Sequence, residues 1–260
     1  MSSISNANER PFPTVSLYGV PFSKMDMQET VAYLTNAIEE RRPHRVITGN
    51  PIMLMVGLDN PGFHRALATA DLVVPDGAGV VWAARHVKQP VKERVAGFDL
   101  MHELLSEGDK RGWSVYLLGT SADTLNAASA NLQKKFPGVR FVGQRDGYFT
   151  DQEDGAVIAS IREANPDMLF VARATMNQEP WIEKYHHELG VPVVMGVGGS
   201  FDVVAGKLKR APAIFRKLHL EWFYRLLQEP SRFPRMLVLP KFALKVIKDG
   251  DKVSKPLKQL

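Results

Sequence analysis

Short apolar runs alternate along the chain with longer stretches in which apolar residues recur every three or four positions. The apolar runs predict strands at residues 45–48, 72–75, 113–118, 139–142, 167–172 and 191–197. The longer stretches predict helices at 26–42, from Pro51 onward, and at 121–136, 151–164 and 178–189. Strands that alternate with helices in this way are typical of a mostly parallel sheet covered by helices on both faces. The sequence therefore predicts an α/β fold.

The pattern changes after Gly206, where two amphipathic helical stretches follow each other. The first places these residues on one predicted helical face: Phe215, Leu218, Trp222 and Leu226; Pro230 and Pro234 interrupt the pattern after it. The second has an apolar face of Phe242, Ala243, Val246 and Ile247, with Lys241, Lys245 and Lys248 elsewhere on the helix. Such a face either lies in a membrane interface or packs on the α/β body. We expect an α/β domain at residues 1–206 and a basic, amphipathic helical appendage at 207–260.

Charge is distributed unevenly along the 260 residues. Residues 207–260 hold 14 Lys or Arg against 4 Asp or Glu, whereas residues 1–206 hold the remaining 19 against 24. A basic tail of this kind indicates a polyanionic partner, either nucleic acid or an anionic membrane, or else a solvated tail. The chain has no cysteine, which excludes disulfides and Cys-ligated metals and fits a reducing cytoplasm. The polar N-terminal segment predicts no secretory signal, and no apolar run approaches the ~20 residues that span a bilayer.

Candidate chemistry lies where the predicted strands end, because parallel α/β sheets bind ligands beyond the carboxyl ends of their strands. Asp76 directly follows a strand, so its carboxylate is either a proton acceptor for a substrate hydroxyl or the N-cap of the next helix. The last strand runs into Gly198 and Gly199, followed by Asp202. Glycines there let backbone amides approach a phosphate group, so we count these residues among the substrate-binding candidates.

Several familiar signatures are missing. The chain has no P-loop motif and no dinucleotide fingerprint after a strand, which argues against an epimerase or dehydrogenase with a redox cofactor. Its seven histidines show no metal-ligand spacing with acids, so we expect no metal site. The aromatic residues of the tail fall at helical spacing, which suggests packing more than base stacking, and we expect no nucleic-acid partner.

Many short motifs resemble, in order, those of the WecG/TagA/CpsF glycosyltransferases. They are Thr48-Gly-Asn50, Asp71 through Asp76-Gly77-x-Gly79, Glu93-Arg94-Val-x-Gly97-x-Asp99, Pro166-Asp167, Gln178-Glu179-x-Trp181, Gly196-Val-Gly198-Gly199-x-Phe201-Asp202, Arg210-Ala-Pro212, and Glu221-Trp222 through Glu229-Pro230-x-Arg232-x-x-Arg235. The resemblance covers nearly the whole chain.

The resemblance implies a Rossmann-like catalytic domain and an inverting, metal-independent transfer. In the TagA branch, N-acetylmannosamine passes from UDP to N-acetylglucosaminyl-diphospho-undecaprenol in teichoic-acid linkage-unit synthesis, and other branches use glucose or N-acetylmannosaminuronic acid. It implies Asp76 as general base, a pocket lined by Thr48, Asn50, Arg94 and Gln178, and appendage arginines Arg225, Arg232 and Arg235 that complete the site. It also implies that the appendage docks on the inner face of a bacterial membrane. Whether the chain forms a homo-oligomer is left open.

One segment departs from the family pattern. Where the family usually reads A-L-G-[AS]-P-[KR]-Q-E, residues 172–179 read Ala-Arg-Ala-Thr-Met-Asn-Gln-Glu. The glycine, the proline and the basic residue are replaced, and Arg173 is new. We expect this segment, Arg173-Ala174-Thr175-Met176-Asn177, to be a loop beside the pocket, so the departure bears on donor preference and activity.

Overall fold

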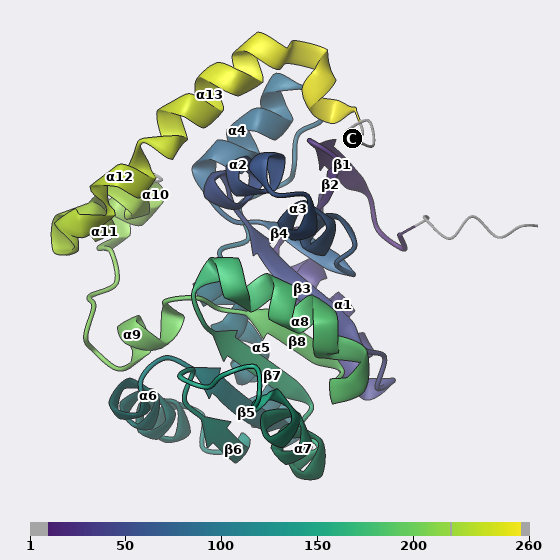
Figure 1. The fold of residues 1–260 in the computed structure, drawn as a ribbon, viewed down its shortest axis with the longest axis vertical. Helices are drawn as coiled ribbons and strands as arrows, with labels where there is room; N and C mark the ends of the chain where they lie inside the picture. Colours follow the sequence, from purple (N-terminus) through teal and green to yellow (C-terminus); the bar gives the residue numbers. More distant parts are fainter. Residues whose placement is uncertain (1–9, 219, 256–260) are drawn as a thin grey trace, which may run out of the picture.

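The centre of the molecule is one eight-stranded sheet with the order β1-β2-β4-β3-β8-β7-β5-β6 (Figure 1). The structure, a computed structural model, describes residues 10–218 and 220–255. The strands are β1 (Thr14–Leu17), β2 (Val20–Ser23), β3 (His44–Gly49), β4 (Leu72–Pro75), β5 (Ser114–Gly119), β6 (Arg140–Arg145), β7 (Met168–Ala172) and β8 (Val193–Gly196). Only β1 and β2 pair in antiparallel fashion. The predicted α/β fold with a mostly parallel sheet is confirmed.

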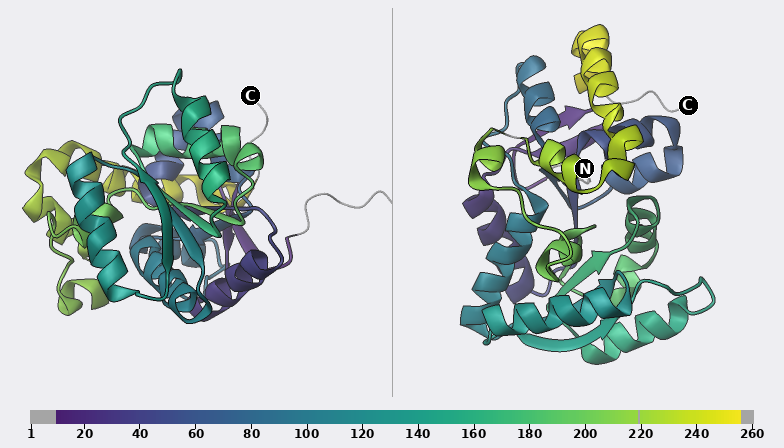
Figure 2. Two further views of the ribbon diagram at one scale, coloured as in Figure 1. Left: turned by 90° about the horizontal axis from the view of Figure 1, so that it is seen from below. Right: turned by 90° about the vertical axis from the view of Figure 1, so that its left-hand side faces the viewer.

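Helices cover both faces of this sheet (Figure 2). One layer consists of α1 (Met27–Glu39), α5 (Gly97–Arg111), α6 (Ala122–Lys135) and α9 (Ser200–Val204). The other consists of α2 (Pro51–Asp59), α3 (Pro61–Ala68), α4 (Ala78–His86), α7 (Asp154–Ala164) and α8 (Thr175–Leu189). Successive strand residues enter opposite layers: Val46 packs with α1 and α5, whereas Ile47 packs with α2 and α3. Burial on both faces explains why the central strands read as uninterrupted apolar runs.

Helix starts follow from local sequence. Asp26 accepts a hydrogen bond from the backbone N–H of Glu29, whose carboxylate accepts one from the backbone N–H of Asp26, so both groups cap α1. Asn50 and Asn60 cap α2 and α3, and each is followed by a proline, whose missing N–H costs nothing in a first turn. Helix α1 ends at Glu39, three residues before the predicted end.

Several elements were not identified from the sequence, among them α3, α4, α5, α9 and the two strands β1 and β2. Helix α5 carries few apolar residues outside its buried face, and α4 follows the Asp76-Gly77 turn directly. The hairpin of β1 and β2 is joined by Tyr18 and Gly19, both with positive φ (51° and 80°). A tyrosine in that conformation gives no turn signal.

The predicted continuous helical face from Phe215 to Leu226 is wrong. The chain forms two helices, α10 (Ala213–Lys217) and α11 (Glu221–Gln228). The backbone N–H of Leu220 bonds the carbonyl of Phe215, which closes a turn wider than that of an α-helix. Pro230 opens a 3₁₀ turn, η1 (Pro230–Arg232), and Pro234 lies in the first turn of α12 (Phe233–Met236), so each proline begins an element.

The last helix, α13 (Val238–Asp249), returns to the body and is followed by the 3₁₀ turn η2 (Gly250–Ser254) (Figure 1). Phe242 and Val246 are buried in the cluster that holds α2 and α4. A membrane-facing role is therefore wrong for these two residues, and packing on the body is confirmed for them. Ile247, on the same predicted face, is 56% exposed. Among the residues described, no helix is long and apolar enough to cross a bilayer.

Candidate functional site

Asp76 lies at the carboxyl edge of the sheet, immediately after β4. Its backbone N–H donates to the carbonyl of Gly49 (2.9 Å), and its Oδ2 accepts from the backbone N–H of Gly97 (3.2 Å). Gly77, not Asp76, is the N-cap residue of α4, and no side chain caps that helix. The alternative in which Asp76 caps the following helix is therefore wrong. Its carboxylate instead accepts from the first residue of α5, and the residue as a whole is partly exposed.

The surroundings of Asp76 shift its pKa toward neutrality. Burial of the carboxyl group raises the pKa to about 6, against the lowering effects of the Gly97 N–H and the Arg94 guanidinium. The carboxylates of Glu221 and Asp99 add to the rise. A carboxyl group with this pKa is ionised at pH 7 and still basic enough to take a proton from a hydroxyl.

Thr48 and Asn50 lie beside Asp76, because β3 and β4 pair in parallel and end together at Gly49 and Pro75. The side chain of Thr48 packs closely on Gly97. A Cβ added at Gly97 would lie 2.6 Å from the Thr48 methyl carbon. Asn50 accepts from the backbone N–H of Met53 (3.1 Å), which occupies its side-chain oxygen in capping α2. Both residues are partly exposed at the same edge as Asp76.

The appendage reaches this edge through α11. Arg94, whose side chain is 14% exposed, forms an ion pair with Glu221, the first residue of α11. One turn further on, Nη2 of Arg225 donates to the carbonyl of Gly199 (3.4 Å). Burial, with Arg232 nearby, lowers the pKa of Arg225, and Glu229, Asp202 and Asp76 oppose this shift. Residues of the appendage thus lie within electrostatic range of the Asp76 carboxylate.

The other appendage arginines differ from each other. Arg232 pairs with Glu229 at 2.7 Å, and Glu229 also lies 3.9 Å from Arg225. Arg235, on α12, is exposed and takes part in none of these contacts. The structure therefore brings Arg225 and Arg232 together near Asp202, while Arg235 lies on the surface of the appendage.

Gln178 ties together the loops after β7 and β8. Its Oε1 accepts from the backbone N–H of Arg173 and from that of Gly198, each at 3.2 Å. The residue is only 4% exposed. Gly198 has a φ of +49°, and a Cβ at Gly199 would displace the guanidinium of Arg225. Gly199 therefore allows the close approach of Arg225, and Gly198 supplies the positive φ that the turn requires.

The segment that departs from the family pattern is helical over much of its length. The predicted loop is wrong from Thr175 onward, because α8 begins there with Ala174 as N-cap residue. The guanidinium of Arg173 lies 4.2 Å from the ring centroid of Phe149. Its charge is balanced from the α7 side by Asp154 and Asp151, and burial lowers its pKa. Arg173 therefore stacks beside α7 and does not replace the family's basic residue at position 177.

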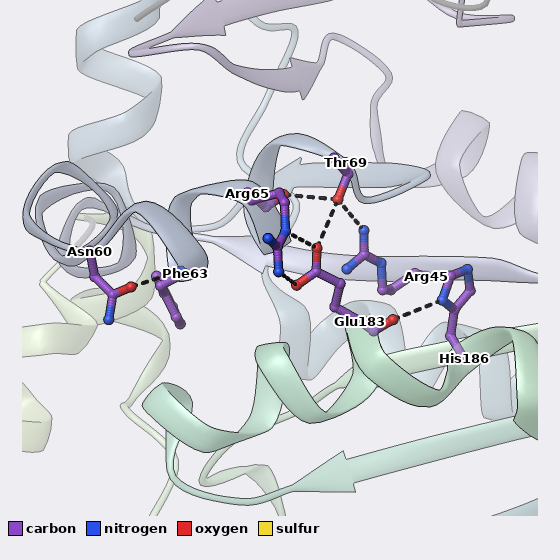
Figure 3. Close-up of polar contacts among 7 residues, drawn as sticks. All are labelled: Arg45, Asn60, Phe63, Arg65, Thr69, Glu183 and His186. Atoms are coloured by element: carbon purple, nitrogen blue, oxygen red, sulfur yellow. Dashed lines mark hydrogen bonds and ion pairs between the residues drawn. The ribbon is translucent and has the colours of Figure 1, made fainter. Parts of the chain in front are cut away.

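Several polar residues near the site make contacts that the sequence did not indicate, although Asp99, Glu179 and Glu221 lie within the motifs that resemble the family. Glu221 lies 127 positions after its partner Arg94, and Arg210 lies 111 positions after its partner Asp99. Glu179 and Arg45 are buried charged residues of α8 and β3. Arg45 donates to Thr69, and Thr69 also contacts Glu183, which pairs with Arg65 (Figure 3). Within residues 10–218 and 220–255, no three His, Asp or Glu side chains are grouped as metal ligands would be.

Comparison with known proteins gives a consistent result. The model of the glycosyl transferase WecG/TagA/CpsF family matches residues 15–255. The chain is 36% identical over 236 residues to an N-acetylglucosaminyldiphosphoundecaprenol N-acetyl-beta-D-mannosaminyltransferase of Bacillus spizizenii, covering 90% of this chain and 91% of that protein. It is 34% identical to proteins of the same name from Bacillus subtilis strain 168 and Staphylococcus aureus strain MW2, covering 91% and 93% of this chain and 92% and 95% of theirs. The chain therefore belongs to the WecG/TagA/CpsF family of glycosyl transferases.

Proposed function

We propose that this protein transfers N-acetylmannosamine from a UDP donor to N-acetylglucosaminyl-diphospho-undecaprenol, with inversion at the sugar carbon and without a metal ion. The names of its relatives in Bacillus and Staphylococcus supply the acceptor and the sugar. The observation that carries the chemistry is the Asp76 carboxylate, whose pKa is about 6, at the ligand edge of the sheet near Arg94 and Arg225.

In this reaction, Asp76 takes the proton of the acceptor hydroxyl as its oxygen attacks the anomeric carbon of the donor. The new bond joins that oxygen to the carbon, and the bond between the carbon and the UDP oxygen breaks. Attack on the face opposite the departing diphosphate inverts the configuration. The proton ends on Asp76 and UDP leaves with the electron pair. The carboxyl group then returns its proton to water before the next cycle.

The departing diphosphate needs positive charge, and the arginines near the site can provide it. Arg94, Arg225 and Arg232 come from the body and the appendage and are at present paired with Glu221 and Glu229. A planar guanidinium binds two phosphate oxygens at once, so a diphosphate can compete with these carboxylates. Preorganised cations of this kind stabilise the charge that develops in the transition state. This arrangement supports the metal-independent part of the proposal.

The division into a catalytic domain at 1–206 and an appendage at 207–260 with two roles belongs to the same proposal. Contacts of Glu221 and Arg225 with the body support its role in completing the site. Its role in binding the inner face of the cell membrane is supported by exposed apolar side chains beside exposed lysines. These are Ile214, Leu218, Leu227, Phe233, Leu237, Leu244 and Ile247, with Lys241, Lys248 and Lys252.

A direct assay tests the proposal. Purified protein is incubated with a short-chain lipid-diphosphate-N-acetylglucosamine and one UDP-sugar at a time, and the product is identified by mass and by its anomeric NMR coupling. We expect transfer of N-acetylmannosamine, an inverted linkage and equal rates with and without EDTA. If the protein prefers UDP-glucose or UDP-N-acetylmannosaminuronic acid, the proposed donor sugar is wrong. If activity is lost in EDTA and restored by Mg²⁺, the proposed metal independence is wrong.

A further inference from the structure

Glu179 is a buried acid directly beside the site. It is 1% exposed and lies in the first turns of α8, next to the end of β8. Its Oε1 accepts from Nε2 of Gln178 at 2.6 Å, and its Oε2 has no hydrogen-bond partner among the residues described. Gly196 makes room for this pair, since a Cβ there would lie 2.2 Å from Nε2 of Gln178 and 2.4 Å from Oε1 of Glu179.

The positive charge that faces Glu179 is Arg45. Arg45 is 2% exposed on β3, directly beneath α8, and donates to Thr69 at 2.8 Å (Figure 3). Burial raises the pKa of Glu179 to about 7, while the Gln178 amide and the charge of Arg45 oppose the rise. Burying the charges of Glu179 and Arg45 costs desolvation free energy, which an apolar pair at these positions would not require. Buried charged groups with shifted pKa values are common where they serve function, and Glu179 lies next to the candidate site.

The two neighbours of the Gln178 amide fix its orientation from both sides. The backbone N–H groups of Arg173 and Gly198 both require an acceptor, so they take the amide oxygen. Glu179 accepts from the amide NH₂ at 2.6 Å, and in its ionised form, which this bond and the charge of Arg45 favour, the carboxylate can only accept. A flipped amide would leave two backbone donors unsatisfied and would place its oxygen against a carboxylate. Glu179 thus selects the one orientation in which Gln178 holds both loops.

The loops that Gln178 holds lead to the cations of the site. Gly198 is followed by Gly199, whose carbonyl accepts from Arg225. A shift of this loop would therefore move the acceptor that keeps the Arg225 guanidinium near Asp202 and Asp76. The Gln178 side chain and the backbone of Gly198 and Gly199 therefore connect Glu179 to Arg225.

We infer that Glu179 is a positioning residue for glycosyl transfer, which orients the Gln178 amide and thereby fixes the loops after β7 and β8. Its effect on turnover rests on the function proposed above, whereas its effect on the loops does not. The two parts can therefore be measured separately.

The first experiment compares Glu179→Leu with Glu179→Gln. Hydrogen exchange of the Arg173 and Gly198 amides is followed by NMR in protein without substrate, and kcat and KM are measured with UDP-N-acetylmannosamine. We expect Glu179→Leu to speed both exchanges and to lower kcat, each by about 10–100-fold, the range for losing a hydrogen bond to a charged group. Glu179→Gln should keep both the exchange rates and kcat close to those of the wild type, because the new amide oxygen can still accept from Gln178.

Glu183→Gln is the matched control. Glu183 lies one turn further along α8, acts on the same Arg45 and pairs with Arg65 (Figure 3). Among the hydrogen bonds of the described residues, none joins Glu183 to Gln178. We expect exchange at Arg173 and Gly198 and turnover to stay within about twofold of the wild type, the range of an exposed ion pair. Equal effects of Glu179→Leu and Glu183→Gln would reduce Glu179 to a member of the charge cluster.

A second pair of variants keeps the test valid if Glu179→Leu does not fold. Gln178→Glu puts two buried carboxylates in contact, and adding Glu179→Gln restores one donor and one acceptor with the original charge. We expect Gln178→Glu to speed exchange at Gly198 and the double variant to return it toward the wild-type rate. If the effects of Gln178→Glu and Glu179→Gln on exchange simply add in the double variant, the inference is overturned. Exchange at the wild-type rate in Glu179→Leu would overturn it as well. If the wild type does not use UDP-N-acetylmannosamine while the exchange results hold, only the proposed donor fails.

Discussion

The two sides of the site are built in different ways. Asp76 follows β4, whose four residues are all buried, and its neighbours Thr48 and Asn50 lie at the end of β3, where five of the six strand residues are buried. Arg225 and Arg232 come from α11 and η1, and none of the residues described in α10, α11, η1 and α12 is buried. The proposed proton acceptor, Asp76, is therefore held by the core, whereas two of the arginines proposed to bind the diphosphate depend on how the appendage packs. Changes to Asp76 should alter the chemistry without altering surface binding, and changes to the appendage arginines should alter the chemistry without unfolding the body.

The sharpest test of the core side is Asp76→Asn. Asparagine keeps the shape and can still accept from Gly97, but it cannot take a proton from the acceptor. We expect kcat to fall by about 10²–10⁴-fold with the melting temperature unchanged or raised. Turnover and thermal unfolding are measured on the same preparation. Wild-type turnover in the folded variant would remove Asp76 from the reaction.

On the appendage side, Arg225→Ala should lower turnover on a soluble acceptor analogue by about 10²-fold, the usual cost of one transition-state donor. Binding to anionic vesicles should change little, because the guanidinium faces Gly199. Lys217→Ala, in α10 and fully on the surface, is the control and should keep full turnover. If Arg225→Ala retains full turnover on the soluble analogue, the appendage serves as an anchor only.

The pH dependence separates the two sides again. With a pKa of about 6 for Asp76, kcat/KM should rise with pH up to about 6 and then level off, with about a tenfold loss at pH 5. Asp76→Asn should flatten this limb, whereas Arg225→Ala should lower the curve without moving it. An acid limb with an apparent pKa near 4 in the wild type would contradict the burial of this carboxyl group.

The same shift predicts a small effect on stability. The folded pKa of Asp76 lies above the ordinary value of 3.8, so folding takes up a proton between these pH values, and the stability contribution of this group falls as pH rises through about 6. Removing the charge should therefore stabilise the protein at pH 7 by roughly 1–2 kcal/mol, after allowance for partial exposure, and by nothing at pH 3. Denaturant unfolding of Asp76→Asn at both pH values measures this.

The smallest expected effect distinguishes two lysines of α13. Lys248 is exposed, whereas Lys245 pairs with Asp249 at 3.0 Å and lies over the ring of Tyr18. Lys248→Gln should weaken binding to anionic vesicles by about fivefold at low salt, since one lysine near such a surface contributes about 1 kcal/mol. Lys245→Gln should instead loosen the contact of α13 with β1. If the wild type, Lys248→Gln and Lys245→Gln bind vesicles equally, these lysines of α13 do not contribute to membrane binding.

The core side of the site could be predicted because its signals are local. An apolar run that ends in Asp76-Gly77 places the carboxylate at the ligand edge, whatever the order of the strands. The appendage side depends on contacts between distant residues, such as Arg94 with Glu221. Helical periodicity predicted that Phe242 and Val246 share a face, and it could not indicate whether protein or lipid covers that face. The break between α10 and α11 likewise depends on backbone bonds that side-chain patterning does not report.

The contact of the β1–β2 turn with the end of α13 and with η2 has a consequence for the arginines. The backbone N–H of Tyr18 donates to the carbonyl of Val253 at 2.6 Å, and the hydroxyl of Tyr18 donates to Asp249. The segment from α10 to α13 is therefore a bridge fixed at both ends, not a tail fixed at one. A bridge holds Arg225 at a high effective concentration over the site, because most orientations open to a free tail are excluded. Cutting the chain before Phe242, which removes the buried contacts of α13 as well as those of Asp249 and Val253, should lower the effective concentration of that arginine without removing it.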